Sequence, residues 1–116
     1  MEQNIWEYDD FIFKGDELKG MTQKGKDKVK LEGKTDLVIP ELTPDGLPLK
    51  KIGDNAFYRR GLTSVVIPNT VESIGYDAFG VCKLKEVKLP EALVNIEGFA
   101  FYRNKLTKVE FGSKVK

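Results

Sequence analysis

The segment "IGDNAFYRRGLTSVVIPNTVES" at residues 52–73 is followed in the chain by two altered copies of itself. It returns as "IGYDAFGVCKLKEVKLPEALVN" at residues 74–95 and as "IEGFAFYRNKLTKVEFGSKVK" at residues 96–116. We call these three segments repeats 1, 2 and 3. Aligned with a shift of 22 residues, they share isoleucine, alanine, phenylalanine, leucine and valine at fixed positions. A fixed period of this length is typical of a protein built from stacked structural units.

Each repeat contains one segment with the alternation of a β-strand and one that suits a turn of helix. The strand segments are "LTSVVI", "LKEVKL" and "LTKVEF", in which we expect Val65 and Ile67 to point inward and Val66 outward. The segment "DNAFYRR" at residues 54–60 predicts a single helical turn on the opposite wall, with Asp54 placed to cap its free amides. The sequence therefore predicts α/β units with one short strand and one helical turn each.

The recurring phrases "I-G-x-x-A-F" and "L-x-x-V-x-I-P" resemble the BspA-type leucine-rich repeat of bacterial and protozoan surface proteins, over about residues 37–116. The resemblance implies a short α/β solenoid and a non-enzymatic protein-interaction or adhesion module of a bacterial surface or secreted protein, hence an extracellular or cell-surface location. Ordinary leucine-rich repeats use an asparagine to hydrogen-bond between turns, and Thr70, Ala92 and Lys114 stand there instead. We therefore expect backbone bonds and hydrophobic stacking to hold the units together.

The first third of the chain lacks the 22-residue period, and residues 1–36 are predicted to form an N-terminal cap of a hairpin and a short helix. The hairpin is expected at "FIFKGDELKGM", and the helix at "TQKGKDKVKL" with a contact face of Met21, Gly25 and Val29.

The solenoid is predicted over residues 37–116, as a partial repeat with an insertion, two full repeats and an incomplete third. The insertion surrounds "TPDG" at residues 43–46, where proline and glycine predict a tight turn in a surface loop.

The composition of the chain excludes several classes of function. The chain has a net charge of +1, which gives no overall field for nucleic acid or anionic lipid, and no apolar run approaches the length of a membrane span. It has no histidine, which removes Cys-His and Ser-His-Asp catalysis and the usual mixed zinc sites. We therefore expect no catalytic residues, no metal site, no cofactor, no nucleic-acid binding and no membrane insertion.

Two surfaces are candidates for binding a protein or cell-surface partner. The first is the concave strand face, whose outward columns are Ser64, Glu86 and Lys108 and then Val66, Lys88 and Glu110. On it we expect Glu86 to pair with Lys108 and Lys88 with Glu110. The second is formed by the two "FYR" segments, which supply Tyr58, Arg59, Tyr102 and Arg103. Alternatively, each tyrosine lies along the neighbouring unit and binds nothing.

Three further features have a functional and a structural interpretation. "KGD" at residues 14–16 resembles an integrin-recognition tripeptide but also suits a polar turn. The lysines of "KGKDKVK" at residues 24–30 could form a basic patch for acidic glycans or phosphates, or simply solvate a helix. Cys82 could be a reactive thiol or a buried structural residue.

The chain stops after the third strand, without a following repeat, at "VEFGSKVK". We expect it either to be a fragment of a longer repeat protein or to cover this edge with another copy, and to self-associate edge to edge through its C-terminal strand. Two other functions stay open beside partner binding. One is a structural spacer or cap that positions another domain, and the other is a glycan-binding accessory segment of a longer chain.

Overall fold

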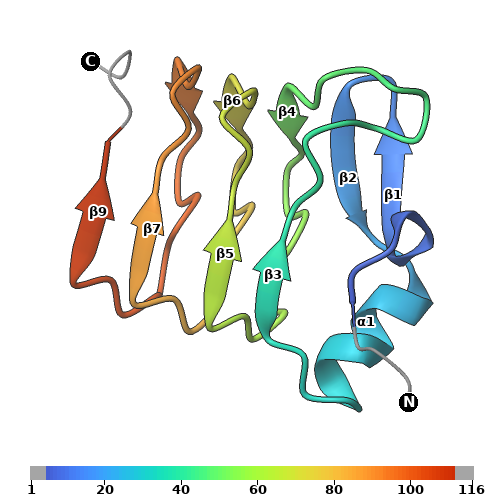
Figure 1. Ribbon diagram of the computed structural model, residues 1–116. Coiled ribbons are helices and arrows are strands. Elements are labelled where there is room, and N and C mark those ends of the chain that lie inside the picture. Colours follow the sequence, from blue (N-terminus) through green and yellow to red (C-terminus); the bar gives the residue numbers. More distant parts are fainter. Residues whose placement is uncertain (1–4, 112–116) are drawn as a thin grey trace.

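The computed structural model describes residues 5–111, and its strands lie side by side from the N-terminal hairpin to repeat 3 (Figure 1). A 3-10 helix, a hairpin and an α-helix come first, followed by short strands separated by turns. In chain order the elements are η1 (Tyr8–Asp10), β1 (Phe11–Lys14), β2 (Glu17–Met21), α1 (Gln23–Lys30), β3 (Asp36–Val38), β4 (Lys51–Ile52), β5 (Ser64–Val66), β6 (Ser73–Ile74), β7 (Glu86–Lys88), β8 (Asn95–Ile96) and β9 (Lys108–Glu110).

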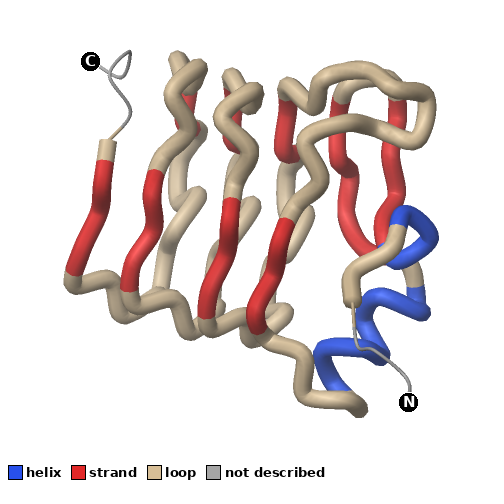
Figure 2. Tube along the Cα trace, viewed as in Figure 1, coloured by secondary structure: helices blue, strands red, loops and turns tan. Residues whose placement is uncertain are grey.

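Two rows of parallel strands run through the repeats (Figure 2). One row is a five-stranded sheet in the order β1-β2-β4-β6-β8, which aligns Ile52, Ile74 and Ile96. The other row contains the predicted strands, in which β3 pairs with β5 and β7 with β9. The prediction of one strand per repeat is thus incomplete, because repeats 1 and 2 each contribute a strand to both rows. In the second row β3–β5 and β7–β9 are separate sheets, so the ladder is interrupted between β5 and β7.

Residues 54–59 form a run of turns, so the helical turn predicted at residues 54–60 is wrong. Asn55 and Arg59 both have φ of 58°, in the left-handed region that a right-handed helix cannot contain. Every second amide of the segment donates to a carbonyl of repeat 2 instead of closing a helical bond. These pairs are Asn55 to Tyr76, Phe57 to Ala78 and Arg59 to Gly80, at 2.8 to 3.0 Å. Repeat 2 binds repeat 3 in the same way, through Asp77 to Gly98, Phe79 to Ala100 and Val81 to Tyr102.

The predicted cap of this segment is also wrong, because Asp54 contacts the next repeat. Its Oδ1 atom accepts a hydrogen bond from the backbone nitrogen of Tyr76 at 2.8 Å. The repeats are so close here that a Cβ added to Gly75 would lie 2.6 Å from the backbone nitrogen of Asp54. The glycine of the "IG" phrase is therefore required by the contact between repeats.

The interior is a continuous stack of apolar side chains, with phenylalanine rings at its centre. Phe57 and Phe79 are fully buried, and their ring centroids are 5.3 Å apart with an interplanar angle of 15°. Phe101 stacks on the other side of Phe79 at 5.4 Å and 6°, and is only partly buried. At the N-terminal end, Phe11 meets Phe57 edge to face at 6.4 Å. These rings connect the hairpin to the last repeat.

Polar side chains also link successive repeats, at the position of Cys82 in repeat 2 and Asn104 in repeat 3. The sequence analysis did not predict these links. Asn104 donates from Nδ2 to the carbonyls of Phe79 and Phe101, at 2.8 and 3.0 Å, and accepts at Oδ1 from the Leu84 amide at 2.9 Å. One repeat earlier, the Cys82 thiol donates to the Phe57 carbonyl at 3.3 Å. The expectation that only backbone bonds and stacking hold the repeats is therefore wrong. Of the three positions named for it, Lys114 lies outside the described residues.

The hairpin and the helix are present where the sequence predicted them. Strand β2 pairs with β4, so the hairpin extends the same sheet as the repeats. Helix α1 is capped by Thr22, whose side chain accepts from the Gly25 amide, and it buries Gly25 and Val29 as expected. It also buries Lys28, which the sequence did not predict. The "TPDG" turn is present too, closed by a bond from the Gly46 amide to the Thr43 carbonyl at 2.9 Å.

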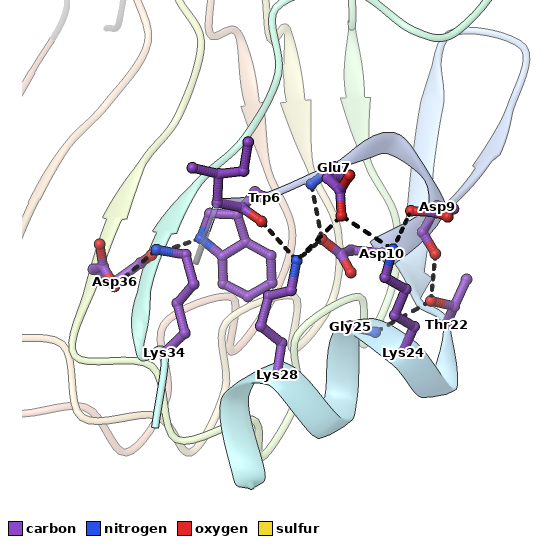
Figure 3. Close-up of polar contacts among 11 residues, drawn as sticks. Trp6, Glu7, Asp9, Asp10, Thr22, Lys24, Gly25, Lys28, Lys34 and Asp36 are labelled. Atoms are coloured by element: carbon purple, nitrogen blue, oxygen red, sulfur yellow. Dashed lines mark hydrogen bonds and ion pairs between the residues drawn. The ribbon is translucent and has the colours of Figure 1, made fainter. Parts of the chain in front are cut away.

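Lys28 forms a buried ion pair with Asp10, at 2.7 Å between Nζ and Oδ2 (Figure 3). The carboxylate of Asp10 is fully buried, and it also accepts from the Glu7 amide at 2.8 Å. The same lysine donates to the Ile5 carbonyl at 2.6 Å and lies 5.5 Å from the centroid of the Trp6 ring. This network fixes the first described residues against α1.

Candidate functional site

The six predicted residues of the strand face gather around one shallow hollow of about 270 Å³. Strands β5, β7 and β9 present them, because alternate residues of a strand point to the same side. The register places Glu86 beside Lys108 and Lys88 beside Glu110, as expected. The hollow is lined by Ser64, Val65, Val66, Glu86, Val87, Lys88, Lys108 and Glu110.

The ion pair on this face forms within β9 and not between strands. Lys108 Nζ lies 3.0 Å from Glu110 Oε1, and both side chains are exposed. Their hydrogen bond lowers the pKa of Glu110 and raises that of Lys108. Glu86 and Lys88 act on them only through longer-range attraction. The prediction of two ion pairs between strands is therefore wrong within the described residues.

The strand face carries exposed apolar side chains beside charged ones. Val66 is 58% exposed and Val38 of the neighbouring β3 is 50% exposed, so an apolar strip lies beside the charged columns. Val65 is half-buried and Val87 is buried, which ties the floor of the hollow to the core. Acidic and basic side chains alternate around the hollow, Glu86 and Glu110 with Lys88 and Lys108.

The two Tyr-Arg pairs lie in the runs of turns at residues 54–59 and 98–103, and they do not line the hollow in the strand face. Arg59 donates from Nε to the Tyr58 hydroxyl at 3.1 Å and stacks on that ring at 5.4 Å. Arg103 lies 5.6 Å from the Tyr102 ring. Tyr58 lies along repeat 2, where a Cβ on Gly80 would be 3.2 Å from its ring. The structural alternative thus describes the placement of Tyr58.

Tyr102 belongs to an exposed aromatic cluster that the sequence analysis missed. Phe99 contacts Tyr102 at 5.0 Å and Tyr76 at 5.6 Å between ring centroids. All three rings are about half exposed. Phe99 occupies the repeat position of Asn55 and Asp77, both polar, and shares their left-handed backbone with φ of 59°. That break in the column was the available sequence signal.

Metal binding and thiol chemistry find no support in the part of the chain that the structure describes. Residues 5–111 contain no group of three or more His, Cys, Asp or Glu side chains placed to hold a metal ion. Cys82 is buried, and burial raises the pKa of its thiol, which disfavours the reactive thiolate. No helix within the same residues has the length and apolar character to cross a membrane.

Comparisons with known proteins agree with the repeat pattern. A solved structure, titled as a leucine-rich repeat protein from Bacteroides capillosus ATCC 29799, is similar in fold with a TM-score of 0.52 and 22% identity, over 82% of this chain and 85% of that one. Curated proteins gave no match. The family described as "BspA type Leucine rich repeat region (6 copies)" matches residues 50–116, more than half of the sequence. The chain belongs to the BspA-type leucine-rich repeat family.

Proposed function

We propose that the chain is a non-enzymatic interaction and adhesion module of a bacterial surface or secreted protein, and that its strand face binds a protein partner. The family supports protein interaction as the general role. We choose the strand face because six outward side chains surround one hollow there, and the floor of this hollow is joined to the core. In this proposal, residues 1–36 cap a short solenoid formed by residues 37–116.

A rigid face favours binding because few side chains lose freedom when a partner docks. The strands that carry the hollow are fixed by parallel pairing and by the stacked core beneath them. Less conformational entropy is then lost on association than a flexible loop would lose. The partner we expect is a folded protein surface, of the kind found in extracellular matrix or on a neighbouring cell.

The test uses a panel of purified, immobilised extracellular-matrix proteins and a glycan array. The variant Val66→Asp/Lys88→Glu changes the face, and Val94→Asp/Lys51→Glu makes the same chemical changes at exposed residues elsewhere. The proposal predicts a matrix protein that retains the chain and the control variant but not the face variant. No binding to either the matrix proteins or the glycan array would favour the structural spacer. Binding to glycans alone would favour the glycan-binding segment.

A second proposal concerns self-association through β9. One edge of β9 pairs with β7, and within residues 5–111 no strand covers the other edge. The apolar side chains there are partly open, with Val109 39% and Phe111 67% exposed. We expect the isolated chain to dimerise at high concentration. Sedimentation as a monomer at millimolar concentration would contradict this proposal.

A further inference from the structure

The turns at the two opposite edges of the stack differ in their charged residues. The turns that precede β5, β7 and β9, residues 59–63, 81–85 and 103–107, lie at one edge, which we call the basic edge (Figure 1). Its turns contain no carboxylate, and their cations are Arg59, Arg60, Lys83, Lys85, Arg103 and Lys105. The turns that follow the strands lie at the other edge and carry Glu41, Asp45, Glu72 and Glu91, together with Lys50, which pairs with Glu72 at 3.2 Å. A net charge of +1 hides this separation.

Helix α1 extends the basic edge at its N-terminal end. Lys26 and Lys30 face Arg59 and Arg60 across a hollow of about 450 Å³ between the helix and repeat 1. The one acidic side chain that lines this hollow, Asp27, accepts a hydrogen bond from Gln23 at 2.8 Å. Helix and repeat thus bring together cations that are about 30 positions apart in the sequence.

The cations of this edge have no counter-ion of their own. Among residues 5–111 the ion pairs occupy other lysines: Lys19, Lys24, Lys28, Lys34, Lys50 and Lys108. Five of the six turn cations are exposed, and Arg60 is half-buried. A row of unpaired, accessible cations is what an anionic ligand requires, since binding does not first have to break an ion pair.

We propose that the basic edge binds a single extended sulfated polysaccharide chain. Successive repeats are spaced by about 4.8 Å, so the cations form a ladder of closely spaced charges that a linear polyanion can follow. Carboxylates lie next to the ladder, because Asp27 lines the hollow between α1 and repeat 1 and Glu86 directly follows Lys85. A duplex nucleic acid or a bilayer presents charge over a broad surface and would meet these carboxylates. A single-stranded nucleic acid is bound largely by stacked aromatic side chains, and the two tyrosines beside these turns, Tyr58 and Tyr102, already contact Arg59 and Arg103.

The experiment measures binding of the chain to heparin, used as a sulfated probe, in about 0.15 M salt. The edge variant is Lys83→Glu/Lys105→Glu, and the matched control is Lys14→Glu/Lys51→Glu, which changes the net charge equally at exposed lysines away from the edge. A lysine near an anionic surface contributes about fivefold to affinity, and each substitution also adds a negative charge, so the edge variant should bind at least about thirtyfold more weakly than the wild type. The control should keep most of its affinity. Thermal melts check that both variants fold.

Three further probes decide the chemistry. Desulfated heparin keeps only its carboxylates and should bind much more weakly than heparin, and binding of heparin to the wild-type chain should weaken steeply as the salt concentration rises. Single-stranded DNA and vesicles with anionic lipid should bind more weakly than heparin. The proposal is overturned if edge and control variants lose equal affinity, if desulfated heparin binds as well as heparin, or if DNA or vesicles bind more tightly.

Discussion

Replacing Phe79 by alanine should destabilise the chain far more than the same change at Phe101. The Phe79 side chain is fully buried, with one ring stacked on each side at 5.3 and 5.4 Å. Its removal loses the transfer free energy of the ring and leaves a cavity that rigid neighbours cannot fill, which costs about 3 to 5 kcal/mol. Phe101 is partly buried and stacks on one ring only, so we expect about half of this loss.

Urea unfolding at 25 °C, followed by circular dichroism, measures both values. The slope of stability against urea should be the same in the two variants, so that the midpoints report stability directly. Phe57→Ala is the internal control, because Phe57 is also fully buried and meets rings on both sides, Phe79 and Phe11. Its loss should match that of Phe79. Equal losses at Phe79 and Phe101 would refute a serial stack in which the end repeat has one neighbour.

Three more changes probe polar groups of the interior. Asn104→Ala removes three hydrogen bonds between and within repeats and should cost about 2 kcal/mol in the same urea assay, whereas no loss would exclude a linking role. Lys28→Met leaves the buried Asp10 carboxylate without its cation and should cost about 3 kcal/mol, of which Asp10→Asn in the same chain should restore a part. Burial raises the pKa of the Cys82 thiol, so the folded chain holds this proton to higher pH than the unfolded chain, and the stability that the proton contributes is fully present below the unfolded pKa of about 9.0 and is lost as the pH rises through the higher folded pKa. Wild type should therefore lose more stability than Cys82→Ser between about pH 8 and pH 10, and equal losses would contradict a buried thiol.

The sequence predicts the repeat, the long strands and the hairpin because each leaves a local pattern. Val65 and Val66 differ in exposure as the alternation requires, and α1 buries Gly25 and Val29 on one face. The row formed by β4, β6 and β8 leaves no such pattern, since two residues such as Ser73–Ile74 are too short to show alternation. The runs of turns at residues 54–59, 76–81 and 98–103 were predicted wrongly as helical turns for another reason. Arg59 has no intrinsic preference for a left-handed backbone, and its conformation follows from the bond to the next repeat.

The sequence likewise predicts one part of the candidate site and not the other. Strand alternation was sufficient to place Ser64, Glu86 and Lys88 on one face, because a strand fixes where each side chain points. The aromatic cluster around Phe99 and the pair of Lys28 with Asp10 depend on how separate segments pack, which periodicity does not report. Charges on the edges were visible as single lysines and arginines, but their convergence required the arrangement of the turns.

Amide exchange at three equivalent phenylalanines tests most directly whether each repeat is held by the next. Phe57, Phe79 and Phe101 all follow alanine in the same kind of turn. The Phe57 and Phe79 amides donate to Ala78 and Ala100 at 2.8 Å, whereas within residues 5–111 no later repeat faces the Phe101 amide. Exchange monitored by NMR should therefore be slow at Phe57 and Phe79 and fast at Phe101. Equal exchange rates at all three amides would contradict the conclusion that each repeat is held by hydrogen bonds to the next.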